Sequence, residues 1–219
     1  MGKVFFVTAT DTGIGKTFIT AGLGRIAQAK GLRIGIGKPI SCGGIDDAVY
    51  YKNKLKLKDS IDSINPVQFK QPLSPYAAMK TGKKKIDIAR IKRSINNLRK
   101  DRDIVLVEGL GGAMAPIKRN YYVADMTKAL QIPCIVIARA GLGTINHTLM
   151  TIDELKKRKI RIAGIIMNRF DGREISQRSN AQMIEELSGI KVIGKIKAKS
   201  SFEALVRQIK DQRTLEALL

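Results

Sequence analysis

The sequence predicts an α/β fold, a single domain with a doubly wound, mostly parallel sheet, and three observations support this. Short runs rich in Ile and Val alternate with helical segments along all 219 residues. Several of these runs are continuously apolar, as expected of strands that are covered on both faces. A chain with 44% apolar and 27% charged residues is typical of a globular protein, and its length suits one core. We therefore expect residues 1–219 to form one domain.

The predicted elements follow one another in a regular order. The strand-like runs are Lys3–Thr8, Arg33–Lys38, Asp103–Glu108, Cys134–Ala138, Arg161–Asn168 and Lys191–Lys195. The helical segments are Lys16–Lys30, Asp46–Lys56, Asp87–Lys100, Val123–Leu130, Thr144–Arg158, Glu174–Leu187 and Phe202–Leu219. Residues 58–86 contain three prolines and predict a long connection with short elements. Right-handed crossovers bring the carboxyl ends of parallel strands to one edge, so residues directly after the strands are the functional candidates.

The first strand leads into Thr8–Thr17, a glycine-containing turn that ends in Gly-Lys-Thr and opens a helix. This is the layout of a phosphate-binding P-loop, where backbone N–H groups and the helix dipole attract phosphate oxygens. Lys16 would reach the β- and γ-phosphates, and the Thr17 hydroxyl would lie on Mg²⁺. The strict motif has glycine at the position of Thr10, and this departure points to one branch of the P-loop proteins.

A lysine follows the second strand at the same predicted edge. Lys38 supplies positive charge where phosphate or carboxylate charge would develop beside a P-loop. The alternative is a plain surface lysine in a basic chain, but the flanking Pro39 and the glycines that follow favour a shaped loop. Asp47 lies just beyond this loop, and it fits either a helix N-cap or a metal ligand.

The third strand ends in a carboxylate, Glu108, which is followed by glycines at 109, 111 and 112. An acid at this place in P-loop ATPases holds Mg²⁺ directly or through water. The glycines allow the backbone to approach a ligand closely. We therefore interpret Glu108 as part of the nucleotide and metal site.

A glycine-rich segment, Ala140–His147, opens a helix after the fourth strand. Free N–H groups at such a helix start could hold a substrate carboxylate. His147 is the only histidine, and we interpret it as structural. Without a Cys/His cluster the sequence supports neither a zinc site nor a Ser-His-Asp triad, and Mg²⁺ with oxygen ligands is the metal that it suits.

The net charge of +21 is the main competing signal, because Lys and Arg neutralise phosphates in nucleic-acid binding. The excess is spread along most of the chain, and aromatic residues are only 5%. A solvated basic surface is the favoured interpretation, and a polyanion-binding surface is the alternative. No apolar run reaches the roughly 18–20 residues that span a bilayer. The two cysteines fit a reducing compartment, and we expect a cytoplasmic location without a membrane partner.

Taken together, these segments resemble the dethiobiotin synthetase family of P-loop NTPases. The resemblance rests on Thr10–Thr17, Lys38-Pro39, Asp47, Pro72–Pro75, Val107–Gly112, Ala124-Asp125, Leu142–His147 and Asn168. It implies an ATP- and Mg²⁺-dependent ligase that carboxylates 7,8-diaminononanoate with CO₂ and closes the ring, giving dethiobiotin, ADP and phosphate. The intermediates would be a carbamate and a carbamic-phosphoric anhydride. It also implies a homodimer, with the diamine near the subunit interface.

The resemblance also implies roles for individual residues. Lys16 and Lys38 would be catalytic, Thr17, Asp47 and Glu108 would hold Mg²⁺, and Asn168 would read the adenine. The nucleotide and its metal would be bound by Gly13, Ile14, Gly15, Lys16, Thr17, Phe18, Asp47, Glu108, Gly109, Leu110, Gly111 and Asn168. The substrate would be bound by Thr12, Ser41, Cys42, Gly143, Thr144, Ile145 and Asn146.

Two departures from the family pattern affect these contacts. Cys42 stands where the family tends to have a hydroxyl residue, so a substrate hydrogen bond would be weakened or moved to Ser41. Lys197 stands where the family favours proline, which leaves open both the contacts of this loop to the base and the nucleotide preference.

Two other functions are left open by the sequence. One is a related P-loop amidoligase or ATPase that acts on another acid. The other is a partition-type ATPase whose basic surface binds DNA. The absence of an extra lysine early in the P-loop, where Asp11 and Thr12 stand, disfavours the second.

Overall fold

A computed structural model describes residues 2–82 and 84–219. The strands of its central sheet are β1 (Lys3–Ala9), β2 (Ile34–Gly37), β5 (Ile104–Glu108), β8 (Cys134–Arg139), β9 (Ile162–Phe170) and β10 (Val192–Lys197). Within the described residues the sheet is six-stranded, with order β10-β9-β8-β1-β5-β2 and parallel pairing throughout. The predicted α/β fold with a mostly parallel sheet is thus confirmed.

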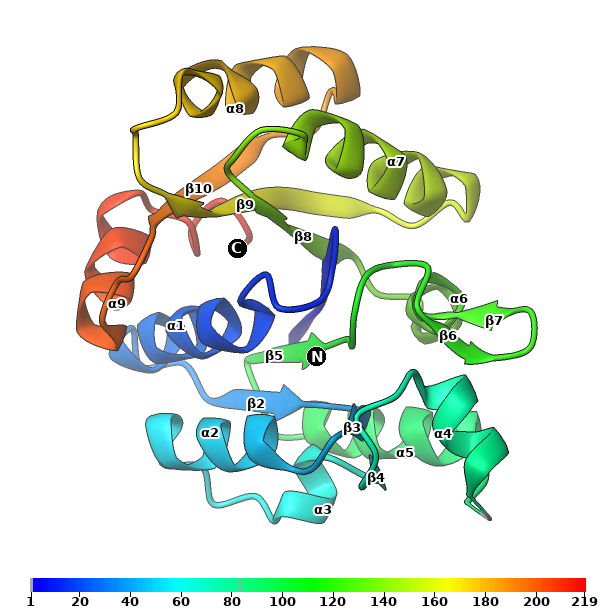
Figure 1. The fold of residues 1–219 in the computed structure, drawn as a ribbon. Helices are drawn as coiled ribbons and strands as arrows, with labels where there is room; N and C mark the ends of the chain where they lie inside the picture. Colours follow the sequence, from blue (N-terminus) through cyan, green and yellow to red (C-terminus); the bar gives the residue numbers. More distant parts are fainter. Residues whose placement is uncertain (1, 83) are drawn as a thin grey trace.

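Helices cover both faces of this sheet (Figure 1). They are α1 (Lys16–Ala29), α2 (Asp46–Leu55), α5 (Ile88–Arg99), α6 (Val123–Leu130), α7 (Thr144–Lys157), α8 (Ile175–Ser188) and α9 (Phe202–Asp211). The cluster on one face includes residues of α1, α2 and α9, and the cluster on the other face includes residues of α5, α6, α7 and α8. None of the helices in the described part of the chain is long and apolar enough to cross a membrane.

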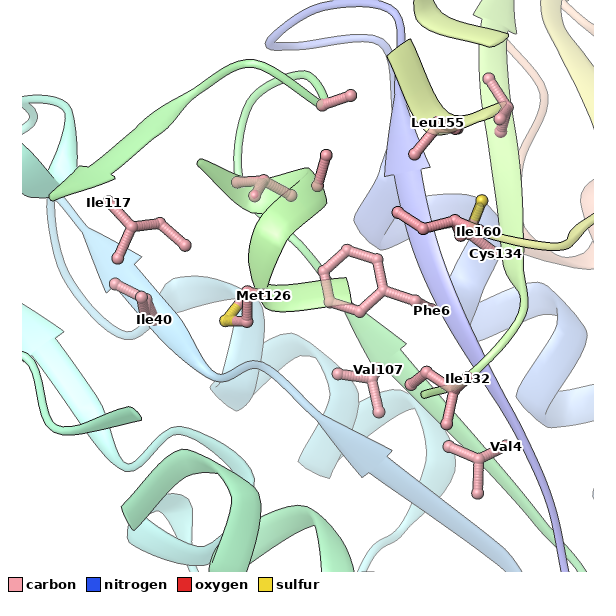
Figure 2. Packing of buried hydrophobic residues seen from close by; sticks show 14 of the residues in the cluster. Val4, Phe6, Ile40, Val107, Ile117, Met126, Ile132, Cys134, Leu155 and Ile160 are labelled. Atoms are coloured by element: carbon pink, nitrogen blue, oxygen red, sulfur yellow. The ribbon is translucent and has the colours of Figure 1, made fainter. Parts of the chain in front are cut away.

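Side-chain alternation along β1 builds these two cores. Val4 and Phe6 point into one core, and Phe5 and Val7 point into the other. Figure 2 shows the Phe6 ring within its cluster. Full burial of such a side chain contributes about 1.5–3 kcal/mol, so β1 is anchored from both sides. A rigid central strand fixes the position of the loop that follows it.

The register of the central strands aligns their carboxyl ends. Val7 of β1 lies opposite Glu108 of β5, and Gly37 of β2 lies opposite Val107. Lys38 follows β2 directly, rather than ending it as predicted. The turn after β1, Lys38 and Glu108 therefore share one edge of the sheet.

The stretch 58–86 contains short elements, as predicted. They are α3 (Ile61–Ile64), β4 (Val67–Phe69) and α4 (Pro75–Thr81). Three strands are additional to the prediction: β3 (Ile40–Cys42), which pairs with β4, and the hairpin of β6 (Pro116–Lys118) and β7 (Tyr121–Tyr122). Strands of two or three residues are too short to show an alternating pattern in the sequence.

The prediction of a last helix over Phe202–Leu219 is wrong in length, because α9 ends at Asp211. Arg213 has a left-handed φ of 51°, which ends the helix. The Gln212 side chain accepts a hydrogen bond from the Lys195 backbone N–H at 2.6 Å and donates one to the Lys195 carbonyl at 2.8 Å. The chain after α9 is thus tied to the edge strand β10.

Candidate active site

The turn after β1 has the backbone shape of a phosphate cradle. Gly13 and Gly15 have φ of 68° and 100°, which glycine adopts without strain. Gly15 caps α1, which begins at Lys16, and no side chain in the described part of the chain caps this end. The first N–H groups of α1 are therefore available to an anion.

The end of β9 braces this turn. Asn168 is buried, and its amide nitrogen donates to the Ile14 carbonyl at 2.7 Å. The Arg169 guanidinium donates to the Gly13 carbonyl at 2.6 Å, and the Arg169 backbone N–H donates to Asn168 Oδ1 at 2.9 Å. Asn168 thus lies against the P-loop, and its reading of adenine stays a prediction.

We expect Gly15→Ala to lose nucleotide binding. An added Cβ would lie 2.4 Å from Asn168 Nδ2, in a backbone conformation that L side chains rarely adopt. This strain should lower the free energy of unfolding by about 1–3 kcal/mol. Relaxation of the strain would move the turn that Asn168 holds in place, and so weaken nucleotide binding. Urea unfolding and calorimetry with Mg·ADP measure the two effects.

Gly31→Ala is the matched control, because Gly31 also has positive φ but nothing lies within 4 Å of its added Cβ. It should lose stability and keep nucleotide affinity. Wild-type affinity in both variants would contradict a P-loop role for this turn.

Four side chains from separate segments meet next to the P-loop. The Thr17 hydroxyl lies 2.9 Å from Asp47 Oδ1 and 3.0 Å from Glu108 Oε1. The Lys38 ammonium lies 2.6 Å from Asp47 Oδ2 and 2.9 Å from Glu108 Oε1. Both Lys38 and Glu108 are buried. The structure thus brings these four predicted residues together, and their roles stay predictions.

The charges of this cluster support one another. Burial alone would lower the pKa of Lys38, but the Glu108 and Asp47 carboxylates raise it above its usual value. Burial alone would raise the pKa of Asp47, but Lys38 above all lowers it below its usual value. Lys38 is thus a cation and Asp47 an anion at neutral pH.

Lys16 is held differently. Its ammonium donates to the Gly111 carbonyl at 2.8 Å and to the Asp11 carbonyl at 3.3 Å. Burial lowers the pKa of Lys16, and Glu108 partly opposes this. Two neutral carbonyls are weaker partners for an ammonium than an anion is, so Lys16 is ready to bind a phosphate.

The oxygen donors of this cluster fit Mg²⁺. Two carboxylates and the Thr17 hydroxyl converge on one place. Mg²⁺ prefers such hard ligands and is commonly held by one or two carboxylates together with substrate phosphates. No group of three or more His, Cys, Asp or Glu side chains suited to a metal occurs in residues 2–82 and 84–219. A metal at this place would bind Asp47 and Glu108, the same carboxylates that pair with Lys38.

A cavity of about 660 Å³ opens over this cluster. The predicted residues that line it are Thr12, Gly13, Gly15, Lys16, Thr17, Lys38, Ser41, Cys42, Asp47, Glu108, Leu110 and Gly111. Residues without a predicted role, from loops and from the first positions of α2 and α4, also line it, namely Gly43, Gly44, Asp46, Pro72, Leu73, Ser74, Pro75 and Ala115. Ser41 donates its hydroxyl proton to Asn65 Oδ1 at 2.7 Å. Burial raises the pKa of the Cys42 thiol, so it stays protonated.

Tyr51 contacts the cluster and was missed by the sequence analysis. Its hydroxyl donates to Glu108 Oε2, and the residue is fully buried. The available signal was its spacing, since Tyr51 follows Asp47 by four positions and so shares its face of α2.

The start of α7 lies outside this cavity. Residues 143–146 are not among those that line it, and the Leu142 backbone N–H donates to the Glu174 carboxylate at 3.0 Å. A second hollow of about 550 Å³ lies between the P-loop and α7, and His147 lines it. Within one chain the predicted carboxylate site and the P-loop cavity are therefore separate.

Comparisons with known proteins bear on this site. Residues 3–204 match a family model described as an AAA domain. The chain is 41% identical to the ATP-dependent dethiobiotin synthetase BioD of Methanococcus vannielii, over 91% of this chain and 95% of the relative. It is 35% identical to the protein of the same name from Methanocaldococcus jannaschii, over 91% and 96%. The cell division protein FtsY of Thermotoga maritima shares the fold, with a TM-score of 0.63 and 15% identity over 100% of this chain and 69% of that one.

Proposed function

Because the chain belongs to the family of ATP-dependent dethiobiotin synthetases, we propose that its P-loop cavity is where ATP drives ring closure of 7,8-diaminononanoate with CO₂. The chain is an ATP-dependent ligase of biotin biosynthesis. The observation that carries the site assignment is the Lys38 ammonium, held between Asp47 and Glu108 at the cavity wall.

The reaction needs charge neutralisation more than acid–base machinery. One amine of the substrate adds to CO₂ and loses a proton, giving a carbamate. A carbamate oxygen attacks the γ-phosphorus and ADP leaves. The second amine then attacks the carbamoyl carbon, which closes the ring and releases phosphate. Negative charge accumulates on the carbamate and the phosphoryl oxygens in the first two steps.

Residues of the P-loop cavity would neutralise this negative charge. The P-loop N–H groups would orient the phosphates, and Lys16 would leave its carbonyl partners for them. Lys38 would stabilise the carbamate and γ-phosphate charge. This family uses Mg²⁺ with ATP. Thr17, Asp47 and Glu108 would hold the ion, which would neutralise part of the phosphate charge. Asn168 would read the base from the end of β9.

The test is a product assay with ATP, bicarbonate, Mg²⁺ and diaminononanoate, in which dethiobiotin is identified by mass spectrometry. Reactions without bicarbonate, or with EDTA, should give no product. ATP hydrolysis without dethiobiotin would instead favour an amidoligase or ATPase acting on another acid. A DNA-dependent ATPase activity would favour the partition-type alternative, which the relatives do not favour.

We further propose that residues 1–219 act as one ligase domain and that two chains form a homodimer in the cytoplasm. The α7 start lies outside the P-loop cavity, and Leu142 and Met150 are 80% and 63% exposed. A second chain would cover these residues and supply the N–H groups of residues 143–146 to the substrate carboxylate. Light scattering that gives the mass of one chain would contradict this arrangement.

A further inference from the structure

A tyrosine outside the predicted site contacts the buried carboxylate of that site. Tyr51 lies on α2 with its side chain fully buried in the core that also contains Ile19, Ile36 and Leu106. Its hydroxyl donates to Glu108 Oε2. Because packing fixes the ring on all sides, the position of this hydroxyl is fixed as well.

The two oxygens of Glu108 have different partners. Oε1 accepts from the Thr17 hydroxyl at 3.0 Å and from the Lys38 ammonium at 2.9 Å, whereas Oε2 accepts from Tyr51. The terminal torsion of a glutamate is soft and roughly two-fold, so partners on one oxygen do not set the plane of the group. A fixed donor on the second oxygen does set it.

The same helix also contacts the two partners of Glu108 Oε1. Asp47 and Tyr51 lie one turn apart on α2, and Asp47 binds both Thr17 and Lys38. The Tyr51 hydrogen bond therefore joins α2 to β5 directly beneath the pair of carboxylates. Without this hydrogen bond the Glu108 carboxylate could rotate, and the direct link between α2 and β5 would be lost.

We propose that Tyr51 is a positioning residue, whose hydroxyl holds Glu108 so that Oε1 faces the Thr17 hydroxyl and the metal of the nucleotide. The inference rests on the nucleotide site of the proposed function. Tyr51 does not line the P-loop cavity, so it acts through Glu108 rather than on the substrate.

The test is Tyr51→Phe, with ADP binding measured by calorimetry in Mg²⁺ and in EDTA. The gain in ADP affinity that Mg²⁺ provides should fall about tenfold or more, the loss expected for one hydrogen bond to a charged group. ADP affinity in EDTA should stay within twofold, which also shows that the variant is folded. In turnover assays, the Mg²⁺ concentration needed for half-maximal rate should rise, and KM for the diamine should stay unchanged.

Tyr50→Phe is the matched control, because the Tyr50 ring packs against Phe202 rather than on Glu108. It should behave as wild type in both titrations. A Tyr51→Phe variant in the Glu108→Gln background should show little further loss, since the two side chains act together.

Three outcomes would overturn the proposal: an unchanged Mg²⁺ gain, equal weakening of ADP binding with and without Mg²⁺, or full additivity with Glu108→Gln. The calorimetry contains neither diamine nor bicarbonate. Its result is therefore independent of the product assay that tests the overall reaction.

Discussion

Lys38→Ala should lower kcat for dethiobiotin formation by about 10²–10³-fold, the loss typical for removing one donor that stabilises developing negative charge. The Lys38 ammonium is buried at the cavity wall, where its field is screened little by water. Its effect should fall on the chemical steps, because the P-loop and Lys16 are left to bind the phosphates. Single-turnover assays with mass-spectrometric detection of dethiobiotin measure the loss.

The variant should remain folded. Removing one partner of a buried ion pair can cost about 3–5 kcal/mol of the free energy of unfolding, because the other charge is left buried. The Asp47 side chain is 37% exposed, so water reaches it. Glu108 stays buried but keeps its hydrogen bonds from Thr17 and Tyr51, so the penalty should be smaller. Lys70→Ala, an exposed lysine, is the control and should match wild type. A Lys38→Ala enzyme that turns over within threefold of wild type would refute the catalytic assignment.

The core of this site could be predicted because it follows from the topology. Parallel strands end at one edge, so Lys38 after β2 and Glu108 at the end of β5 had to lie near the turn after β1. The local pattern predicted the P-loop itself, since strand, glycine turn and helix start are contiguous in sequence. No long-range packing detail was needed for either step.

The rest depends on tertiary packing. Tyr51 in a sequence reads as one more apolar helix residue. Its hydroxyl meets Glu108 only because α2 joins α1 and β5 in the same core, which brings Tyr51 to the end of β5. The loops that line the cavity at 43–46 and 72–75 come together through β3 and β4, whose three-residue strands carry no pattern. Residues 143–146 lie at the start of α7, as predicted, but they do not line the P-loop cavity. Their contact with the substrate carboxylate belongs to the proposed dimer.

Glu108→Gln should lose the Mg²⁺-dependent part of nucleotide affinity and lower turnover by about 10²-fold or more. The side chain keeps its shape but replaces a charged ligand by a neutral amide, and Mg²⁺ binds carboxylate oxygens in preference. Two donors, the Lys38 ammonium and the Thr17 hydroxyl, meet on Oε1, so the amide oxygen should take that side. Its NH₂ group then faces the Tyr51 hydroxyl, which can accept as well as donate. Calorimetry with ADP in Mg²⁺ and in EDTA separates the metal from the phosphate contribution.

The control is Glu186→Gln, an exposed glutamate on α8, which should be indistinguishable from wild type. The two active-site variants should differ in kind. Lys38→Ala keeps Mg·ADP binding and loses chemistry, whereas Glu108→Gln loses the Mg²⁺ gain in affinity first. If Glu108→Gln kept the full Mg²⁺ gain while turnover fell, Glu108 would serve mainly to hold the Lys38 ammonium, since that is its other direct contact. Mg²⁺ binding would then depend on Asp47 and Thr17. The Tyr51 hydrogen bond would, through Glu108, position the Lys38 ammonium and not the metal.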